Sequence, residues 1–427
     1  MRYWDEGVRS LLRPLKHCCH VNPAVLSETT DPDWEFDYID IGSVSLSEGV
    51  THKVRMRFAA SPSRARKPVR EGDILVSTVR TYLRAIAAVE PSDTPQVAST
   101  GFAVLRANKG TDARFLYRVV QSNPFVEQVV SQSTGVSYPA INPSTLSNIE
   151  VPLPDLATQR QIADFLDRET ARIDLLIEKK QRLVALLGEK WESVVENAIS
   201  TGGKWTKLGH HVGILSGYAF PSSDFSTDPA DIPLLRGANV SPGSIRWDDT
   251  VYWSRERLGE VSRFMLGAGD VVLGMDRPWI SSGIRIAELT EQDAPALLLQ
   301  RVCQIEPRAT LDKQFMKLLL TSRQFLAYFE PIMTGVSVPH ISPDQVSSFR
   351  FEYVERDQQV RRATAAGRER ERIVRVQQST EKSIDRLKEY RSALITAAVT
   401  GQIDVTTYAK SGTPGRRLDA IQEEMGA

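Results

Sequence analysis

Two arginines in this chain each stand two residues before an aromatic side chain. Arg80 precedes Tyr82, and Arg277 precedes Trp279. A guanidinium can bind O6 and N7 of guanine with two hydrogen bonds or neutralise a phosphate, and an aromatic ring can pack on a sugar or an extruded base. We therefore predict that both pairs contact nucleic acid. The alternative, that each arginine only buttresses a loop, remains open.

A run of basic residues lies between Thr51 and Arg70, a stretch without any acidic side chain. The whole chain carries 53 basic and 53 acidic residues, so its net charge gives no sign of a polyanionic partner. Clustered Lys and Arg are nevertheless how a neutral protein would contact phosphates, although a solvated surface loop is the commoner form of such a run. We predict phosphate contacts for Lys53, Arg55, Arg57, Arg64, Arg66 and Lys67.

The segment TGVSYPAINP at 134–143 returns as TGVSVPHISP at 334–343. Its hydroxyl groups can donate to phosphate, although the segment can equally serve only to shape a turn. The hydroxyl candidates are Thr134, Ser137, Thr334 and Ser337. Tyr138 and His340 lie where the two copies differ, so we predict that they contact unlike bases.

Further matches show that the sequence contains two copies of one internal repeat. GDILVSTVRTY at 72–82 corresponds to GDVVLGMDRPW at 269–279, and Phe115, Ser122 and Phe125 return as Phe315, Ser322 and Phe325. Short apolar runs after a glycine turn predict strands, and 114–130 and 313–328 have the character of helices. Each copy is therefore predicted to hold one mixed α and β globular domain that positions its own arginine and aromatic pair.

A long helix is predicted to follow each globular domain. Apolar residues recur in steps of four and three from Ile162 to Val194, which is a heptad seam with polar residues at Glu169, Lys180 and Lys190. The second helix ends in a related segment at 390–401. We expect the two helices to pair antiparallel within the chain and the polar seam positions to set their register or dock partners; pairing between chains in a homodimer is the alternative.

The motifs of common enzymes are missing from the sequence. It contains no GxxxxGK[ST], GxGxxG, GxSxG, HExxH or paired CxxC pattern, and no NPPY or DPPY motif. We expect no catalytic, cofactor or metal site here, so that any catalytic groups would belong to another chain. No apolar run approaches the ~18 residues that cross a bilayer, and the first residues lack signal-peptide character. A cytoplasmic location is expected.

The sequence from 134 to 183, TGVSYPAINPSTLSNIEVPLPDLATQRQIADFLDRETARIDLLIEKKQRL, resembles the junction of a target-recognition domain and a spacer helix in specificity subunits of type I restriction-modification systems. The two-copy layout extends this resemblance through Gly401. In the second copy PLPDLATQRQI is replaced by EYVERDQQVRR, which is where the chain departs from the pattern.

The resemblance implies an α+β fold with two target-recognition domains, 1–154 and 204–354. Two long antiparallel coiled-coil helices, 155–203 and 355–401, would join them in an internal pseudo-twofold repeat. A C-terminal tail, 402–427, follows. Because residues 404–427 contain Gly, Pro and a charged end, much of that segment is expected to be loosely held.

The resemblance also implies a non-catalytic subunit whose domains each recognise half of a bipartite, asymmetric site in double-stranded DNA. The helices would set the spacing and bind two methyltransferase subunits, and restriction subunits would complete the complex. S-adenosylmethionine, ATP and magnesium would be used by those partner chains. The alternative function is a coiled-coil scaffold that binds proteins and has no DNA specificity.

Overall fold

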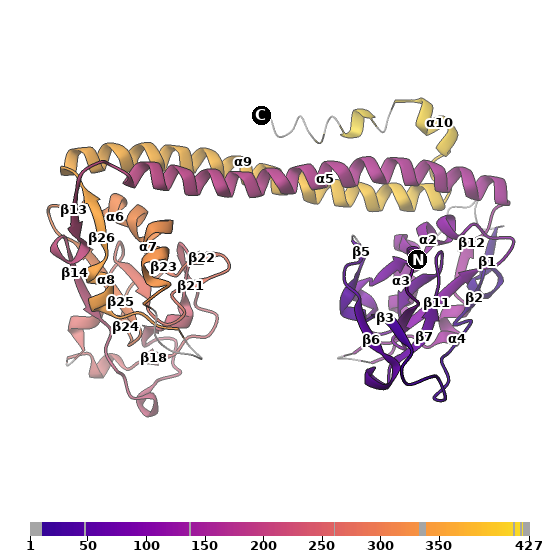
Figure 1. The fold of residues 1–427 in the computed structure, drawn as a ribbon, viewed down its shortest axis with the longest axis horizontal. Helices are drawn as coiled ribbons and strands as arrows, with labels where there is room; N and C mark the ends of the chain where they lie inside the picture. The colour runs from indigo at the N-terminus through magenta and orange to yellow at the C-terminus, as the bar shows by residue number, and fades with distance from the viewer. Residues whose placement is uncertain are drawn as a thin grey trace. The chain divides into compact units, whose positions relative to one another are not determined.

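The computed structural model describes residues 11–46, 48–135, 138–259, 261–332, 339–412, 415–418 and 421. The chain forms two compact units, one of Met1–Arg182 with Ser379–Ala427 and the other of Leu183–Gln378. Each unit holds one globular domain and part of each of two long helices, α5 (Leu156–Ile199) and α9 (Arg356–Val399), which are drawn in Figure 1. The predicted fold class, two α+β domains joined by two long helices, is confirmed.

The globular domain of unit 1 contains two four-stranded sheets. One has the order β2-β11-β8-β9 and is antiparallel throughout. The other has the order β6-β3-β10-β7, in which β3 and β10 run parallel. These strands are β2 (Cys19–Val21), β3 (Glu35–Ile39), β6 (Val54–Arg57), β7 (Ala65–Val69), β8 (Ile74–Ser77), β9 (Ile86–Ala88), β10 (Gln96–Ser99) and β11 (Phe102–Ala107). A two-stranded ladder of β1 (Leu12–Pro14) and β12 (Glu150–Pro152) leads to α5, and β4 (Val44–Ser45) pairs with β5 (Gly49–Val50).

Unit 2 repeats the two four-stranded sheets of unit 1 strand for strand. Its sheets have the orders β14-β25-β20-β23 and β18-β15-β24-β19, and β15 and β24 again run parallel. The strands are β14 (Val212–Ser216), β15 (Ile232–Leu235), β18 (Tyr252–Trp253), β19 (Met265–Leu266), β20 (Val271–Gly274), β23 (Ile286–Glu288), β24 (Ala296–Leu298) and β25 (Val302–Pro307). β13 (Lys204–Lys207) and β26 (Arg350–Tyr353) form the ladder before α9, and two hairpins, β16 (Val240–Ser241) with β17 (Ser244–Ile245) and β21 (Trp279–Ile280) with β22 (Gly283–Ile284), complete the unit.

Short helices cover one sheet of each domain. They are α2 (Ala113–Gln121), α3 (Asn123–Ser131) and α4 (Pro143–Ser147) in unit 1, and α6 (Lys313–Leu320), α7 (Arg323–Phe329) and α8 (Pro343–Ser348) in unit 2. The carboxylates of Asp112 and Asp312 cap α2 and α6 by accepting hydrogen bonds from backbone N–H groups of the first turn. The paired phenylalanines found in the sequence, Phe115 with Phe315 and Phe125 with Phe325, are all buried in the cores beneath these helices.

A buried glutamine ties the start of each long helix to its own globular domain. Gln159 Oε1 accepts a hydrogen bond from Asp112 N at 2.8 Å, and Nε2 donates to Gly110 O at 3.2 Å and Pro154 O at 2.8 Å. Gln359 makes the same three bonds in unit 2, to Asp312 N, Thr310 O and Val354 O. Both side chains are 0% exposed, so the two copies share one device for holding helix to domain.

The long helices pair antiparallel inside each unit. In unit 1 the first half of α5 meets the second half of α9, where Leu166 and Ile173 share a core with Leu387 and Leu394. In unit 2 the second half of α5 meets the first half of α9, with Val195 and Ile199 beside Ala363 and Ala366. Pairing within the chain therefore buries the first part of the heptad seam, from Ile162 to Ile173, whereas Leu183 farther along it is 36% exposed.

One polar seam position forms an ion pair across the two helices, and another forms ion pairs within its own helix. Lys190 forms an ion pair with Glu369 across the helices of unit 2. In unit 1 Glu169 is buried and holds Arg168 and Arg172, each at 3.1 Å. Arg391 reaches across to Asp174 at 2.8 Å in the same unit. Charged groups thus accompany the apolar seam in both halves of the helix pair.

The beginning of the C-terminal tail is better ordered than the sequence indicates. Asp404 caps α10 (Val405–Lys410) by accepting hydrogen bonds from the N–H groups of Thr406 and Thr407. Val405 and Leu418 are buried in the core of unit 1, and the ring of Tyr408 packs edge-on against Phe165 at 6.1 Å between centroids. The expectation of a loosely held tail is wrong for these residues, because their apolar side chains find a surface on the helix pair. Across the described ranges, no helix is apolar and long enough to span a membrane.

Candidate nucleic-acid interface

The first arginine of the sequence analysis lies in a loop that three backbone hydrogen bonds hold in place. Thr78 N donates to Gly101 O at 2.8 Å, Ile141 N donates to Thr78 O at 2.9 Å, and Arg80 N donates to Pro139 O at 2.7 Å. Residues 78–84 and 138–141 are thereby joined at the end of β8. We call these two segments together the first arginine loop.

The second arginine loop, residues 275–279 and 339–341, repeats this pattern. Met275 N donates to Arg301 O at 2.8 Å, Ile341 N donates to Met275 O at 3.0 Å, and Arg277 N donates to Pro339 O at 2.7 Å. The bonds join equivalent positions of the two copies. Arg80 and Arg277 therefore occupy the same place in two copies of one loop.

Both arginines also share an unusual backbone conformation. The φ angle is 49° at Arg80 and 44° at Arg277, in the left-handed region that side chains other than glycine seldom adopt. Such a conformation costs of order 1 kcal/mol and persists only where the surrounding structure enforces it. The three hydrogen bonds of each loop supply that enforcement, so both arginines leave the backbone in a direction set by the fold.

The first arginine loop brings together two of the predicted contact residues. The guanidinium carbon of Arg80 lies 4.7 Å from the ring centroid of Tyr138, a cation–π distance. Tyr138 is 65% exposed and Tyr82 53%, so two aromatic rings face solvent at this loop. Thr134 exchanges backbone hydrogen bonds with Ala140, both at 2.9 Å. Its backbone therefore shapes the turn, while its side chain remains exposed.

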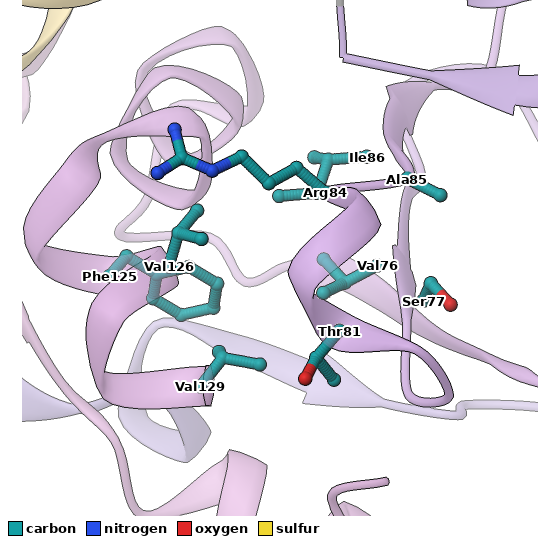
Figure 2. Close-up of a pocket in the computed structure, with 9 residues that line it drawn as sticks. All are labelled: Val76, Ser77, Thr81, Arg84, Ala85, Ile86, Phe125, Val126 and Val129. Carbon is teal, nitrogen blue, oxygen red and sulfur yellow. The ribbon is translucent and has the colours of Figure 1, made fainter. Parts of the chain in front are cut away.

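The first loop rests on α3, as Figure 2 shows. Arg84 Nη1 donates to Asn123 Oδ1 at 3.0 Å, and the hydroxyls of Thr81 and Ser133 lie 2.8 Å apart. A small, mainly apolar cavity separates the loop from the helix; it is lined by Val76, Ser77, Thr81, Arg84, Ala85, Ile86, Phe125, Val126 and Val129. The two hydrogen bonds and the side chains that line the cavity thus support the first arginine loop.

The second arginine loop differs in its side chains. Arg277 is exposed, but Trp279 lies in the β21–β22 hairpin and packs partly against the core of unit 2, unlike the exposed Tyr82. His340 is half-buried and pairs with Asp276 through a β-bridge. Of the remaining predicted residues in these segments, Ser137, Thr334 and Ser337 lie outside the described residues.

Sequence reasoning missed the residue that supports the second loop. Arg285 donates through Nε to Val240 O at 2.8 Å, through Nη1 to Asp276 O at 3.2 Å, and through Nη2 to Gly237 O. Burial lowers the pKa of this guanidinium from its usual value. Its structural role has no signal in the sequence, because the carbonyls that it binds come from distant segments.

Three of the six basic residues predicted to contact phosphate are already paired with acidic side chains. Arg55 Nε lies 3.0 Å from Asp37, Arg57 Nε lies 3.3 Å from Glu35, and Arg64 Nη2 lies 3.4 Å from Asp40. These pairs join β6 and the approach to β7 with residues 35–40. The guanidiniums remain exposed, so they can still meet phosphates, but part of their charge is neutralised.

Lys67 does not fit the prediction of phosphate contact. Its side chain is 8% exposed, its Nζ donates to Phe102 O, and desolvation lowers its pKa. The strand β7 alternates between buried and partly exposed residues, and Lys67 faces inward together with Ala65 and Val69.

The remaining two predicted residues of the basic run, Arg66 and Lys53, have no acidic partner among the described residues. Arg66 donates to Ala65 O at 2.9 Å, and its guanidinium lies 4.8 Å from the ring centroid of Phe58. Lys53 is half-buried just before β6. Among the residues that the structure describes, no group of three or more His, Cys, Asp or Glu side chains is arranged to hold a metal ion.

Part of the chain is similar to known proteins. Residues 60–185 match the model of the type I restriction modification DNA specificity domain. The chain is 33% identical over 161 residues to the type I restriction enzyme EcoAI specificity subunit of Escherichia coli, covering 38% of this chain and 27% of that protein. It is 28% identical over 265 residues to the type I restriction enzyme MjaVIII specificity subunit of Methanocaldococcus jannaschii, covering 57% of this chain and 60% of that protein. The matches thus span about a quarter and three fifths of these two relatives.

The fold has a counterpart among solved structures. One chain, from work described as the structural basis of complex assembly and conformational transition of the type I R-M system, aligns with a TM-score of 0.72. The alignment covers 92% of this chain and 98% of that chain at 20% sequence identity. Since the identity is low, this likeness concerns the fold.

Proposed function

We propose, from the premise that this chain belongs to the family of type I restriction-modification specificity subunits, that it is the subunit that recognises the DNA sequence. Each globular domain recognises one half of a bipartite, asymmetric site in double-stranded DNA. The chain itself is non-catalytic. Methylation and cleavage belong to partner chains.

The duplicated arginine loop is the observation that carries this proposal. Two domains present an exposed arginine from the same backbone position, at φ angles of 49° and 44°. The neighbouring side chains differ, with Tyr82 exposed in one copy and Trp279 partly packed in the other. The two loops have the same backbone conformation and different side chains. This suits two domains that bind DNA in the same orientation and recognise different base pairs.

The residues predicted to contact DNA fall into two classes in this proposal. Arg80, Tyr82, Tyr138, Arg277, Trp279 and His340 contact bases or sugars at the arginine loops. Phosphate contacts come from Lys53, Arg55, Arg57, Arg64, Arg66 and the hydroxyls of Thr134, Ser137, Thr334 and Ser337. Phosphate contacts add affinity but little sequence preference, so they need not match between the copies.

The long helices are proposed to set the spacing between half-sites and to bind two methyltransferase subunits. Each helix has 44 residues, which corresponds to roughly 65 Å at the α-helical rise. S-adenosylmethionine is used by the methyltransferase subunits, and ATP and magnesium are used when restriction subunits join the complex. A cytoplasmic location suits a protein that acts on cellular DNA.

The test is co-expression with its methyltransferase subunits, followed by sequencing of methylated DNA. We expect adenine methylation confined to one bipartite motif with a constant gap between its halves. A coiled-coil scaffold without DNA specificity would instead give a complex with no sequence-selective methylation. That second result would overturn the proposal.

A further inference from the structure

We propose that Arg80 recognises a guanine in the half-site of the first domain and that Tyr138 positions its guanidinium for this purpose. This inference rests on the proposed function and deepens it. It assigns one base type to one side chain, and it gives Tyr138 a positioning role in addition to its proposed contact with DNA.

The backbone of Arg80 is fixed before any ligand arrives. Its N–H is bound to Pro139 O at 2.7 Å, and Thr78, two residues earlier, is bound to both Gly101 and Ile141. The Cα–Cβ bond of a residue at a φ of 49° leaves the chain in a direction that right-handed or extended backbone does not provide. The loop therefore aims this side chain specifically.

Tyr138 restrains the far end of the same side chain. A free arginine loses rotamer entropy when it is held in one geometry. The guanidinium carbon already lies 4.7 Å from the centre of the tyrosine ring, so part of that cost is met in the unbound protein. A guanidinium has five N–H donors, and those that point away from the ring remain available to a ligand.

The charge of Arg80 is also available. Over the described part of the chain, its guanidinium forms neither an ion pair nor a hydrogen bond. The exposed arginines of the basic run are different, since Arg55, Arg57 and Arg64 each have a carboxylate partner. Arg80 is thus exposed, and its backbone conformation fixes the direction of its side chain. Among the described residues it has no acidic partner, unlike Arg55, Arg57 and Arg64.

The geometry favours guanine over phosphate as the ligand. A phosphate contact needs only a positive charge, which lysine supplies equally well. Guanine presents O6 and N7 together in the major groove, and their recognition needs two parallel N–H donors. An arginine fixed at both ends supplies that pair of donors in one orientation, whereas a phosphate contact would gain little from such restraint.

The second domain lacks the same ring in its sequence, where Val338 stands 200 residues after Tyr138. Arg277 therefore has no tyrosine at that position to hold its guanidinium. The pairing of Arg80 with Tyr138 is accordingly a property of the first domain. The proposed guanine contact concerns the first half-site alone.

The experiment uses the complex of this chain with its methyltransferase subunits and a duplex carrying its methylated motif. Each guanine of the first half-site is replaced in turn by adenine, with its complement, or by 7-deazaguanine, which removes the N7 acceptor. Initial methylation rates are measured for wild-type protein and for Arg80→Lys, Tyr138→Phe and Tyr138→Ala. Arg57→Lys is the control, because Arg57 is an exposed arginine with carboxylate partners.

We expect 7-deazaguanine at one position to slow the wild-type complex by roughly tenfold or more. Arg80→Lys should lose that sensitivity together with the guanine preference at the same position. Tyr138→Phe should keep the preference, since the ring is retained, and Tyr138→Ala should reduce it severalfold. Arg57→Lys should leave the preference unchanged, and preferences in the second half-site should persist in every variant.

Full guanine discrimination by Arg80→Lys at every position of the first half-site would overturn the inference. A wild-type complex that is insensitive to 7-deazaguanine throughout that half-site would overturn it as well. Either result leaves sequence-selective methylation intact. The failure of this inference is therefore distinguishable from the failure of the proposed function, in which wild-type protein would direct no selective methylation.

Discussion

The two units have the same backbone pattern but bind their helices with different chemistry. In unit 1, the nearly buried guanidinium of Arg118 donates to Asp167 at 2.8 Å and to Thr170 at 3.1 Å. The equivalent position of α6 is Leu318, which is 8% exposed in an apolar core. The bonds of Gln159 and Gln359, in contrast, are alike. Duplicated backbone contacts thus preserve the fold, and the side chains around them are free to diverge.

The same contrast holds along the helix pair. Tyr390 packs against the core of unit 1 and its counterpart Trp191 against the core of unit 2, but only Trp191 has a guanidinium over its ring, that of Arg370 at 4.9 Å, among the described residues. Phe165 meets the ring of Tyr408 from the tail, and the residue 200 positions later is Ala365. The C-terminal tail therefore packs on the part of the helix pair that belongs to unit 1. The two halves are distinguishable surfaces despite their common origin in a repeat.

The largest expected effect comes from the shared glutamines. Gln159→Ala should destabilise unit 1, and Gln359→Ala should destabilise unit 2 by a similar amount, about 3 kcal/mol in each case, since one buried N–H and two buried C=O groups lose their partner. Hydrogen exchange of peptides from β8 and β11, compared with β20 and β25, would locate each effect.

Two exposed glutamines that lie close to the buried ones in the same helices provide matched controls. Gln161→Ala and Gln358→Ala should change exchange in either unit by little, because alanine is the better helix former and neither side chain is buried. A loss in one unit only, from both buried variants, would contradict the equivalence of the two contacts.

A smaller effect is expected from exchanging chemistry between the copies. Arg118→Leu places the residue of α6 into α2, and Arg114 still pairs with Asp167 at 3.1 Å. We expect a loss of about 1 kcal/mol, against about 3 kcal/mol for Arg118→Ala, because an apolar side chain of similar bulk can replace a buried ion pair at little cost. Denaturant midpoints for the two variants would measure the difference.

Equal destabilisation by leucine and alanine at position 118 would mean that the ionic contact is itself required in unit 1. Leu318→Ala in unit 2 is the companion variant. It should cost about 3 kcal/mol as a loss of packing alone. The comparison therefore separates ionic from apolar attachment of domain to helix.

The smallest effect concerns pH. His211 and Cys18 are equivalent, since each follows a short turn and accepts a bond at its carbonyl, from Arg308 N at 2.8 Å and from Asn108 N at 3.1 Å. His211 stacks on Tyr353 at 4.8 Å, and burial, followed by the charges of His210 and Arg308, lowers its pKa below 6.5. The neutral form is thus favoured in the folded state.

Stability from neutral His211 is fully present above pH 6.5 and is lost as pH falls from 6.5 towards the lower folded pKa. We expect the thermal midpoint of unit 2 to fall slightly between pH 7.5 and pH 5.5. His211→Cys, which installs the residue of unit 1, should flatten this dependence, because burial raises the pKa of the Cys18 thiol to about 11. An unchanged pH profile in this variant would assign the titration elsewhere; His20→Asn in unit 1 is the control.

Much of the architecture could be predicted because it depends on local patterns. The offset of 200 between the copies, the heptad seam and the glycine turns before β8 and β20 are properties of short segments. They predicted two mixed domains and two long helices. They also placed Arg80 and Arg277 at equivalent positions, which the shared backbone hydrogen bonds now explain.

The sequence by itself thus determined the repeat, the fold class and the equivalence of the two arginines. Only the tertiary structure decided that Lys67 faces inward, that Arg55, Arg57 and Arg64 have acidic partners, and that the ring of Tyr138 covers the guanidinium of Arg80. The physical reason is that charge and exposure depend on segments brought together by folding. A basic run in the sequence does not specify which carboxylates will lie beside it.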